Sequence, residues 1–300
     1  MWPRLPRNAL TVDADRPAAF ASHPVSVTVE LAWRFVYRRM ANKSRPMPLT
    51  GIGVKGANMT VIYQPALVLL SIGVAILGSL AALALTAGSH GRDPDAWQSS
   101  FVLVNGGLIM GSTIWSMHFV AMMAVDLPIL VNYNLLETVG STCLAIVSTG
   151  VALYVVSAHR LGRWSIPFGA TFMGLGIAGM HYLGMSAIRG CGLAYDFRLV
   201  AASVLVAVVA SMAALWFAFY KRGIVTTLAG GVVQGLAIAS MHYTAMAATY
   251  FVPLGAEVNL SAPLFRQSSL AYMIASAIAV ISLGNLLLLA AISPRQSNYE

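Results

Sequence analysis

Three copies of a short pattern that joins thioether and imidazole side chains occur in this 300-residue chain. The first copy reads Met117-His118-Phe119-Val120-Ala121-Met122, and the others begin at Met180 and Met241. In each copy a second Met follows the His by four residues, and a Gly precedes the first Met by six. The copies lie 63 and then 61 residues apart. A repeat at nearly fixed spacing predicts an architecture built from repeated units.

The pattern predicts a metal site. Residues four apart share one face of a helix, so each copy presents an imidazole beside a thioether. Thioether sulfur selects soft ions, Cu(I) above all, whereas imidazole suits copper, zinc, iron and nickel. The mixture therefore favours copper. The candidate ligands are His118, His181, His242, Met122, Met185, Met246, Met117, Met180 and Met241. For a single copy, helix packing is the alternative explanation.

An aromatic residue follows each of these histidines: Phe119, Tyr182 and Tyr243. The hydroxyl groups of Tyr182 and Tyr243 are candidates to donate hydrogen bonds to a metal ligand. Packing, or a position at the membrane interface, is the alternative for all three.

The composition indicates a membrane protein, because 58% of the residues are hydrophobic and only 9% are charged, against about 25% charged in soluble domains. Seven segments approach the roughly 20 apolar residues that a bilayer requires. They lie near 61–87, 101–124, 136–158, 166–187, 199–220, 224–250 and 270–293. We expect an all-α membrane protein of seven transmembrane helices: three two-helix repeats, each with the motif late in its second helix, and a closing helix. We also expect the three motif histidines to be the only readily ionisable side chains in these segments, which we expect to contain no Asp, Glu, Lys or Arg.

Two-helix units keep their direction across the membrane, so the three motifs lie on one side, roughly 10 Å below the surface. The loops on that side carry Arg189, Arg198 and Arg266. The opposite side carries Arg92, Arg160, Arg163, Lys221, Arg222 and Arg295. Because basic loops stay in the cytoplasm, we expect a bacterial inner-membrane protein with periplasmic motifs and a cytoplasmic C-terminus.

The ends of the chain differ from this membrane region. Residues 1–58 hold nine of the 18 Lys and Arg residues, which predicts a basic and poorly ordered extension. Residues 59–293 form the predicted membrane domain, and residues 294–300 a short cytoplasmic tail. Membrane lipid is the expected surrounding. A nucleic-acid partner is not expected, since no recognition motif accompanies the basic residues.

The chain resembles the MHYT family of bacterial membrane sensor domains, whose name is spelled by Met241-His242-Tyr243-Thr244. The resemblance covers residues 60–293, and the run 65–71 resembles the family's first span. It implies motifs in alternate helices near the outer face, with the motif His and Met residues holding one or two copper ions. It also implies sensing of oxygen, CO or NO. The fourth motif position is Val120 in the first copy and Leu183 in the second, which argues against that position as a ligand.

Many relatives of that family continue into a cytoplasmic signalling domain, whereas this chain stops seven residues after Ser293. We therefore expect a stand-alone sensor that binds copper, responds to a diatomic gas or to redox state, and passes its signal to a separate protein. One alternative is a carrier that delivers copper to a membrane or periplasmic enzyme. Another is a haem protein that uses two of the histidines. We do not expect an enzyme, because no nucleophile–base–acid set can be assembled, and a homo-oligomer remains open.

Overall fold

The computed structural model describes residues 61–89, 96–129, 131–158, 162–220, 223–253, 264–266 and 269–274. The predicted N-terminal extension and tail lie outside these residues, as does most of the predicted closing helix, 270–293. The first six predicted membrane segments each correspond to one long helix. These helices are α2 (Pro65–Ser89), α3 (Ala96–Met123), α4 (Leu135–Ser157), α5 (Ser165–Ser186), α6 (Phe197–Tyr220) and α7 (Ile224–Ala248). A short 3₁₀ helix, η1 (Gly162–Trp164), precedes α5.

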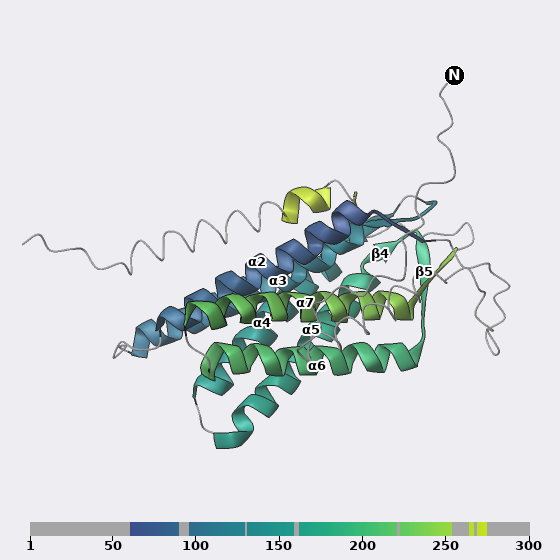
Figure 1. Ribbon diagram of the computed structural model, residues 1–300. Helices are drawn as coiled ribbons and strands as arrows, with labels where there is room; N and C mark the ends of the chain where they lie inside the picture. Colours follow the sequence, from purple (N-terminus) through teal and green to yellow (C-terminus); the bar gives the residue numbers. More distant parts are fainter. Residues whose placement is uncertain are drawn as a thin grey trace, which may run out of the picture.

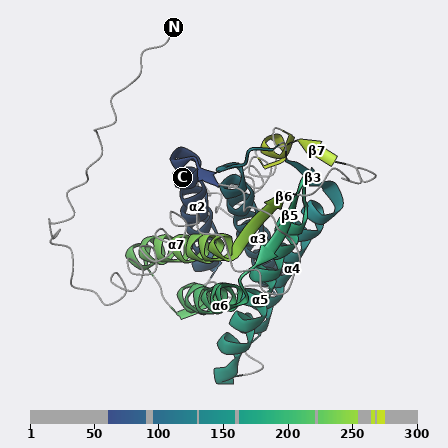
Figure 2. The same cartoon turned by 90° about the vertical axis from the view of Figure 1, so that its right-hand side faces the viewer.

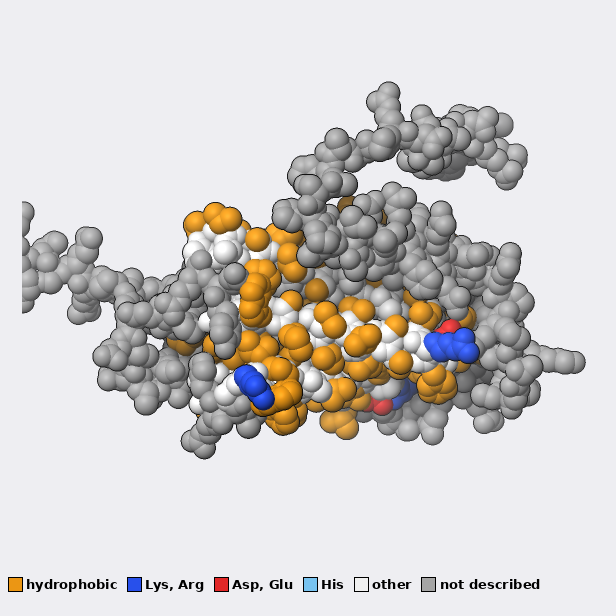
Figure 3. Space-filling view, turned by 60° about the horizontal axis from the view of Figure 1, so that its bottom comes forward, with side chains coloured by type: hydrophobic (Ala, Val, Ile, Leu, Met, Phe, Trp, Pro, Cys, Tyr) orange, Lys and Arg blue, Asp and Glu red, His pale blue; other side chains and the backbone are white. Residues whose placement is uncertain are grey.

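The helices are those of a multi-pass membrane protein. Five of the described helices, α2, α3, α4, α6 and α7, are long and apolar enough to cross a bilayer. The sixth, α5, contains five glycines and packs between α4 and α6. The outward surface is also apolar: Leu136, Leu69 and Phe197, for example, are 78%, 69% and 83% exposed. Figure 3 shows such side chains covering the middle of one face, with the few visible charges near its margins.

The six helices form a closed ring in which motif helices alternate with helices that lack the motif. Each helix packs against the next along the chain, and α7 packs against α2 to close the ring. The motif helices α3, α5 and α7 also touch one another. Figure 2 looks at this arrangement from the end where the motifs lie. The alternation brings three equivalent helix faces toward one axis.

Glycines of the repeated pattern make the closest helix contacts. A Cβ atom added at Gly111 would lie 2.5 Å from a backbone Cα of α4, and at Gly174 it would lie 2.6 Å from one of α6. At Gly235 it would lie 2.5 Å from a Cα of α2. Small residues let helix backbones meet in this way within lipid. The same repeat position thus joins α3 to α4, α5 to α6 and α7 to α2.

Short strands cover the motif end of the bundle, where Figure 1 shows β4 and β5. The strands are β1 (Ile62–Tyr63), β2 (Val125–Asp126), β3 (Asn132–Asn134), β4 (Ile188–Arg189), β5 (Cys191–Tyr195), β6 (Thr249–Pro253) and β7 (Leu264–Arg266). They pair antiparallel as β1 with β2, β3 with β4 and β7, and β5 with β6. The segment after each motif helix thus pairs with the segment before an outer helix. The prediction of a purely helical fold missed these strands.

The expectation that histidines are the only readily ionisable side chains in the apolar segments is wrong at Glu137. This residue lies in the first turn of α4, where a negative side chain suits the helix dipole. Its Oε1 atom lies 2.9 Å from Nη2 of Arg189 in strand β4. The side chain of Asn134 caps the same helix by accepting a hydrogen bond from the Glu137 amide. Glu137 therefore belongs to the strand-covered margin of the bundle.

Candidate metal centre

The repeat predicts that the motif histidines meet, and the structure brings His118, His181 and His242 together between α3, α5 and α7. Nδ1 of His118 lies 3.1 Å from Nδ1 of His242 and 3.1 Å from Nδ1 of His181. The ring centroids are 4.8 to 5.1 Å apart, with interplanar angles of 73° to 79°. All three side chains are fully buried. The histidines lie five or six residues before the ends of their helices.

Proton counting shows that these rings do not satisfy one another. A ring nitrogen of a neutral imidazole either donates one hydrogen or offers one lone pair. The Nδ1 atom of His118 faces two other Nδ1 atoms, so it satisfies at most one of them well. The Nε2 atoms of all three rings are buried and have no hydrogen-bond partner among the described residues. Buried polar atoms without partners are uncommon in native proteins.

The converging nitrogens fit a metal ion. When each imidazole carries its proton on Nε2, each Nδ1 offers a lone pair to a metal ion, and Nδ1 of His118 lies 3.1 Å from each of the other two. Metal–imidazole bonds of about 2.0–2.1 Å place the nitrogens of a tetrahedral set roughly 3.3 Å apart. The two observed separations of 3.1 Å are within a few tenths of that value. Ring nitrogens of all three histidines lie within 4.8 Å of one another, which makes them the one three-residue metal-competent cluster in the described part of the chain.

Gly184 leaves room for one of these rings. It lies in α5, three residues after His181, where the other two motif copies have Ala121 and Ala245. A Cβ atom at Gly184 would lie 2.5 Å from Nε2 of His118 and 3.0 Å from its Cδ2. The absence of a side chain at this one position therefore fixes how closely α5 approaches the imidazole of α3.

The aromatic residues that follow the histidines pack edge-on against them. The centroid separations are 4.7 Å for His118 and Phe119, 4.9 Å for His181 and Tyr182, and 5.0 Å for His242 and Tyr243. The interplanar angles lie between 80° and 88°. Each imidazole thus has an apolar ring beside it that limits its rotation.

The two tyrosine hydroxyls form hydrogen bonds to the outer helices. The Tyr182 hydroxyl lies 2.8 Å from Oγ of Ser203 in α6, and the Tyr243 hydroxyl lies 2.8 Å from Oγ of Ser71 in α2. Both serines are the seventh residues of their helices, as is Ser141 in α4. These contacts connect the histidine centre to the outer helices. A role for either tyrosine toward a metal ligand stays a prediction.

Sequence reasoning missed these serines because each lies far along the chain from its tyrosine. A usable signal was present, since a serine recurs at one position of each outer helix. The third pair is incomplete. The corresponding motif aromatic is Phe119, which has no hydroxyl. All three serines donate to the carbonyl three residues earlier, so Ser141 lacks only the tyrosine partner.

The six motif methionines are all buried in the same core as the histidines. The leading residues Met117, Met180 and Met241 are as buried as those four residues after the histidines, Met122, Met185 and Met246. Burial therefore does not separate the two sets. Their role as thioether ligands stays a prediction, as does the identity of the metal.

Side chains of the strand layer contact the aromatic residues that lie beside the histidines. Tyr133 of β3 and Cys191 of β5 are buried, and burial raises the pKa of the Cys191 thiol to about 11. Burial, together with the neighbouring Tyr182 and Cys191, raises the pKa of Tyr195 to about 12. The ring of Tyr133 lies 6.0 Å from Phe119, and that of Tyr195 lies 5.5 Å from Tyr182. Aromatic contacts thus run from the strand layer to the neighbours of the histidines.

Comparison with known proteins shows which family has these features. The profile of the MHYT repeat, described as a bacterial signalling protein N-terminal repeat, matches residues 52–98, 111–168, 174–231 and 235–292. Three of these segments begin at or beside the motif glycines Gly111, Gly174 and Gly235 and run into the following helix. The family repeat is thus framed differently from the two-helix units that we expected.

Curated relatives match over the same region. MucR of Pseudomonas aeruginosa, named a bifunctional diguanylate cyclase/cyclic di-GMP phosphodiesterase, is 44% identical over 64% of this chain and 29% of its own length. NbdA of the same organism, named a cyclic di-GMP phosphodiesterase, is 37% identical over 72% of this chain and 29% of its own. The signalling protein YkoW of Bacillus subtilis is 33% identical over 64% of this chain and 24% of its own.

The chain therefore spans less than a third of the length of each of these relatives. No solved structure is similar enough to match it. The family profile covers well over half of the residues, in four successive repeats. The chain belongs to the MHYT family and carries a multi-pass membrane domain of the bacterial signalling type.

Proposed function

We propose that this domain binds copper through Nδ1 of His118, His181 and His242 and reports on redox state or on a diatomic gas. The observation that carries the proposal is the convergence of three fully buried imidazoles whose nitrogens cannot all pair with one another. Buried motif methionines make the surroundings soft, which favours copper over zinc. Bound copper would supply a redox-active ion able to take a gas molecule as a further ligand.

Burial favours a sensor over a carrier. A carrier must exchange its ligands with those of an acceptor protein, whereas these imidazoles lie beneath a strand layer and are inaccessible to solvent. The geometry also disfavours haem. Nitrogen atoms 3.1 Å apart leave no space for a porphyrin between two axial histidines.

The proposed output is control of cyclic di-GMP turnover. MucR and NbdA, which share the membrane region, are both named for enzymes of that nucleotide. The matched region is less than a third of either protein. The proposed task of this domain is therefore to change its conformation and act on an enzyme outside the matched region. We place it in the bacterial inner membrane with its strand layer in the periplasm, in line with the loop charges.

The test is the response of copper-loaded protein to gas. The full chain in detergent is loaded with Cu(I), and CO binding is followed by infrared spectroscopy. The expected result is a copper-bound CO band in wild type that disappears in His242→Ala and persists in His159→Ala, a control outside the predicted spans. A parallel exposure to oxygen should generate a Cu(II) electron paramagnetic resonance signal.

A second measurement separates sensor from carrier. Wild type challenged with a Cu(I) chelator should release its copper slowly, because the ligands are buried. Release as fast as mixing would favour the carrier. Copper-loaded protein that responds to neither CO, NO nor oxygen would refute the sensor proposal.

A further inference from the structure

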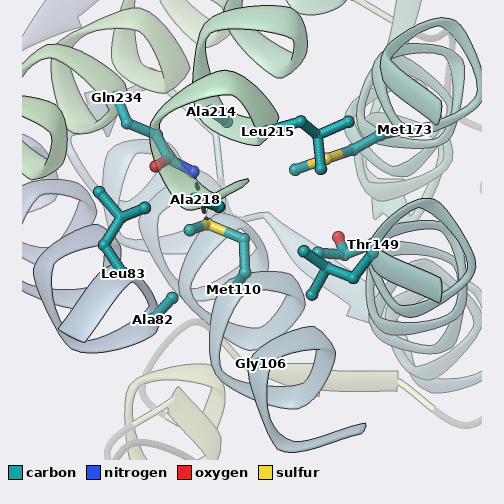
Figure 4. A pocket seen from close by; sticks show the side chains of 11 residues that line it. Ala82, Leu83, Gly106, Met110, Thr149, Met173, Ala214, Leu215, Ala218 and Gln234 are labelled. Atoms are coloured by element: carbon teal, nitrogen blue, oxygen red, sulfur yellow. Dashed lines mark hydrogen bonds between the residues drawn. The ribbon is translucent and has the colours of Figure 1, made fainter. Parts of the chain in front are cut away.

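A second cluster of soft side chains lies in the same ring of helices, farther from the strand layer. A cavity there touches all six helices, and its lining includes Met110 of α3, Met173 of α5 and Gln234 of α7. Figure 4 shows these three side chains directed into the cavity, among small and aliphatic residues. All three are buried, with exposures of 4%, 2% and 3%.

These three residues occupy equivalent positions of the repeat. Each lies eight residues before the motif histidine of its own helix: Met110 before His118, Met173 before His181, and Gln234 before His242. Eight helical residues rise by about 12 Å. The three motif helices therefore present a second layer of matched side chains, about two turns inward from the imidazoles.

The polar atoms of this layer are incompletely satisfied. Nε2 of Gln234 donates to Sδ of Met110 at 3.3 Å. Oε1 of Gln234 is buried, with no hydrogen-bond partner in the described part of the chain. A buried amide oxygen without a donor costs about 1–3 kcal/mol. Rotation of the amide by 180° about its terminal bond would turn Oε1 toward Sδ of Met110, so that the oxygen and the sulfur could bind the same cation.

We propose that Met110, Met173 and Gln234 form a second ion site, for a soft monovalent cation of the Cu(I) class. Two thioethers and one amide oxygen are neutral ligands, and thioether sulfur selects Cu(I). No carboxylate is among the described residues that line the cavity, so a divalent ion would bring in twice the charge without compensation. The site shares no ligand with the histidine centre and lies about two turns away along the same three helices. It is therefore a second binding site for the ion within the membrane.

The test uses Ag(I), a soft monovalent ion that needs no reductant, with the full chain in detergent. Silver bound per protein is measured after removal of free ion, for wild type and for Met110→Leu/Met173→Leu. Leu nearly preserves the volume of Met, and such exchanges usually cost under about 1.5 kcal/mol. The double variant should lose one equivalent of silver. The matched control Met123→Leu/Met212→Leu, which changes two less buried methionines, should lose none.

A measurement on wild type keeps the test independent of any effect on folding. Methionine methyl groups are labelled with ¹³C, and their resonances, 15 in all, are followed during titration. Those of Met110 and Met173 should shift and saturate with Ag(I) and stay unmoved with Zn²⁺. Silver content that is unchanged in the double variant, or methyl resonances that do not respond, would overturn the second site. The variant His118→Ala/His181→Ala/His242→Ala retains both sulfurs, so the same titration on it tests the second site alone. The result therefore holds even if the histidine centre binds no metal.

Discussion

Replacing Gly184 by Ala tests whether the spacing between α5 and His118 sets metal affinity. The added Cβ atom would lie 2.5 Å from Nε2 of His118, 3.0 Å from its Cδ2 and 3.4 Å from Cζ of Phe119. Favourable contacts between such atoms are about 3.5–4.0 Å long. The imidazole is fully buried and has Phe119 edge-on beside it. We therefore expect the ring to retreat from the added methyl group by roughly 1 Å, since this is the shortfall in contact distance.

That displacement exceeds what a metal site tolerates, because ligand distances in real sites stay within about 0.2 Å of ideal values. Changes to the groups that orient metal ligands typically weaken metal binding about 10- to 100-fold. We expect a loss of Cu(I) affinity in that range for Gly184→Ala, which is about 1.4–2.8 kcal/mol.

The assay is competition for Cu(I) between the detergent-solubilised chain and a chelator of known affinity. The matched control is Gly140→Ala in α4, whose added Cβ would lie an ordinary 3.7 Å from Cδ2 of Leu183. The control should bind copper like wild type. An affinity of Gly184→Ala within twofold of wild type would show that His118 either yields without cost or is no ligand.

Four further substitutions test the packing, the hydrogen bonding and the strand layer, each by unfolding in detergent. Gly174→Ala should destabilise the protein by about 1–3 kcal/mol, because its Cβ would lie 2.6 Å from the α6 backbone. Gly150→Ala, whose Cβ would have nothing within 4 Å, should stabilise the protein by up to about 1 kcal/mol. The reverse order of stabilities would refute the packing. Tyr182→Phe removes the hydroxyl 2.8 Å from Ser203 and should cost about 0.5–1.5 kcal/mol, so an unchanged melting temperature would contradict that bond. Burial raises the pKa of the Cys191 thiol from 9.0 to about 11. As pH rises, the unfolded chain loses this proton before the folded protein does, so the free energy of unfolding should fall between about pH 9 and 11. Cys191→Ala should make this fall smaller.

The sequence predicted the helices well because membrane segments can be recognised from their length and their apolar composition. The structure places six helices within a few residues of the predicted segments. It also brings the histidines together, which identical motifs in alternate helices imply. The strand layer was missed, because its strands are two to five residues long and pair with segments far away in the sequence.

Other features depend on contacts that no single helix encodes. Glu137 falls within an apolar segment, and only its position in the first turn of α4, beside Arg189, shows that it lies at the margin. The Tyr243 hydroxyl reaches Ser71, 172 residues away. The space left by the missing side chain of Gly184 is filled by the imidazole of His118, which lies on another helix. Each requires the closed arrangement of the six helices before it becomes visible.

The most direct test of the histidine centre compares two triple substitutions in the full chain. One replaces the motif residues His118, His181 and His242 by Ala, and the other replaces the three histidines outside the predicted spans, His23, His90 and His159, by Ala. Bound copper is counted per protein after removal of free ion, and circular dichroism confirms that both variants keep their helices. The account predicts that the motif variant loses the copper held by the histidine centre, one equivalent per protein, while the other variant binds as much as wild type. Copper in the motif variant equal to that of wild type would contradict it and leave the histidines as packing residues.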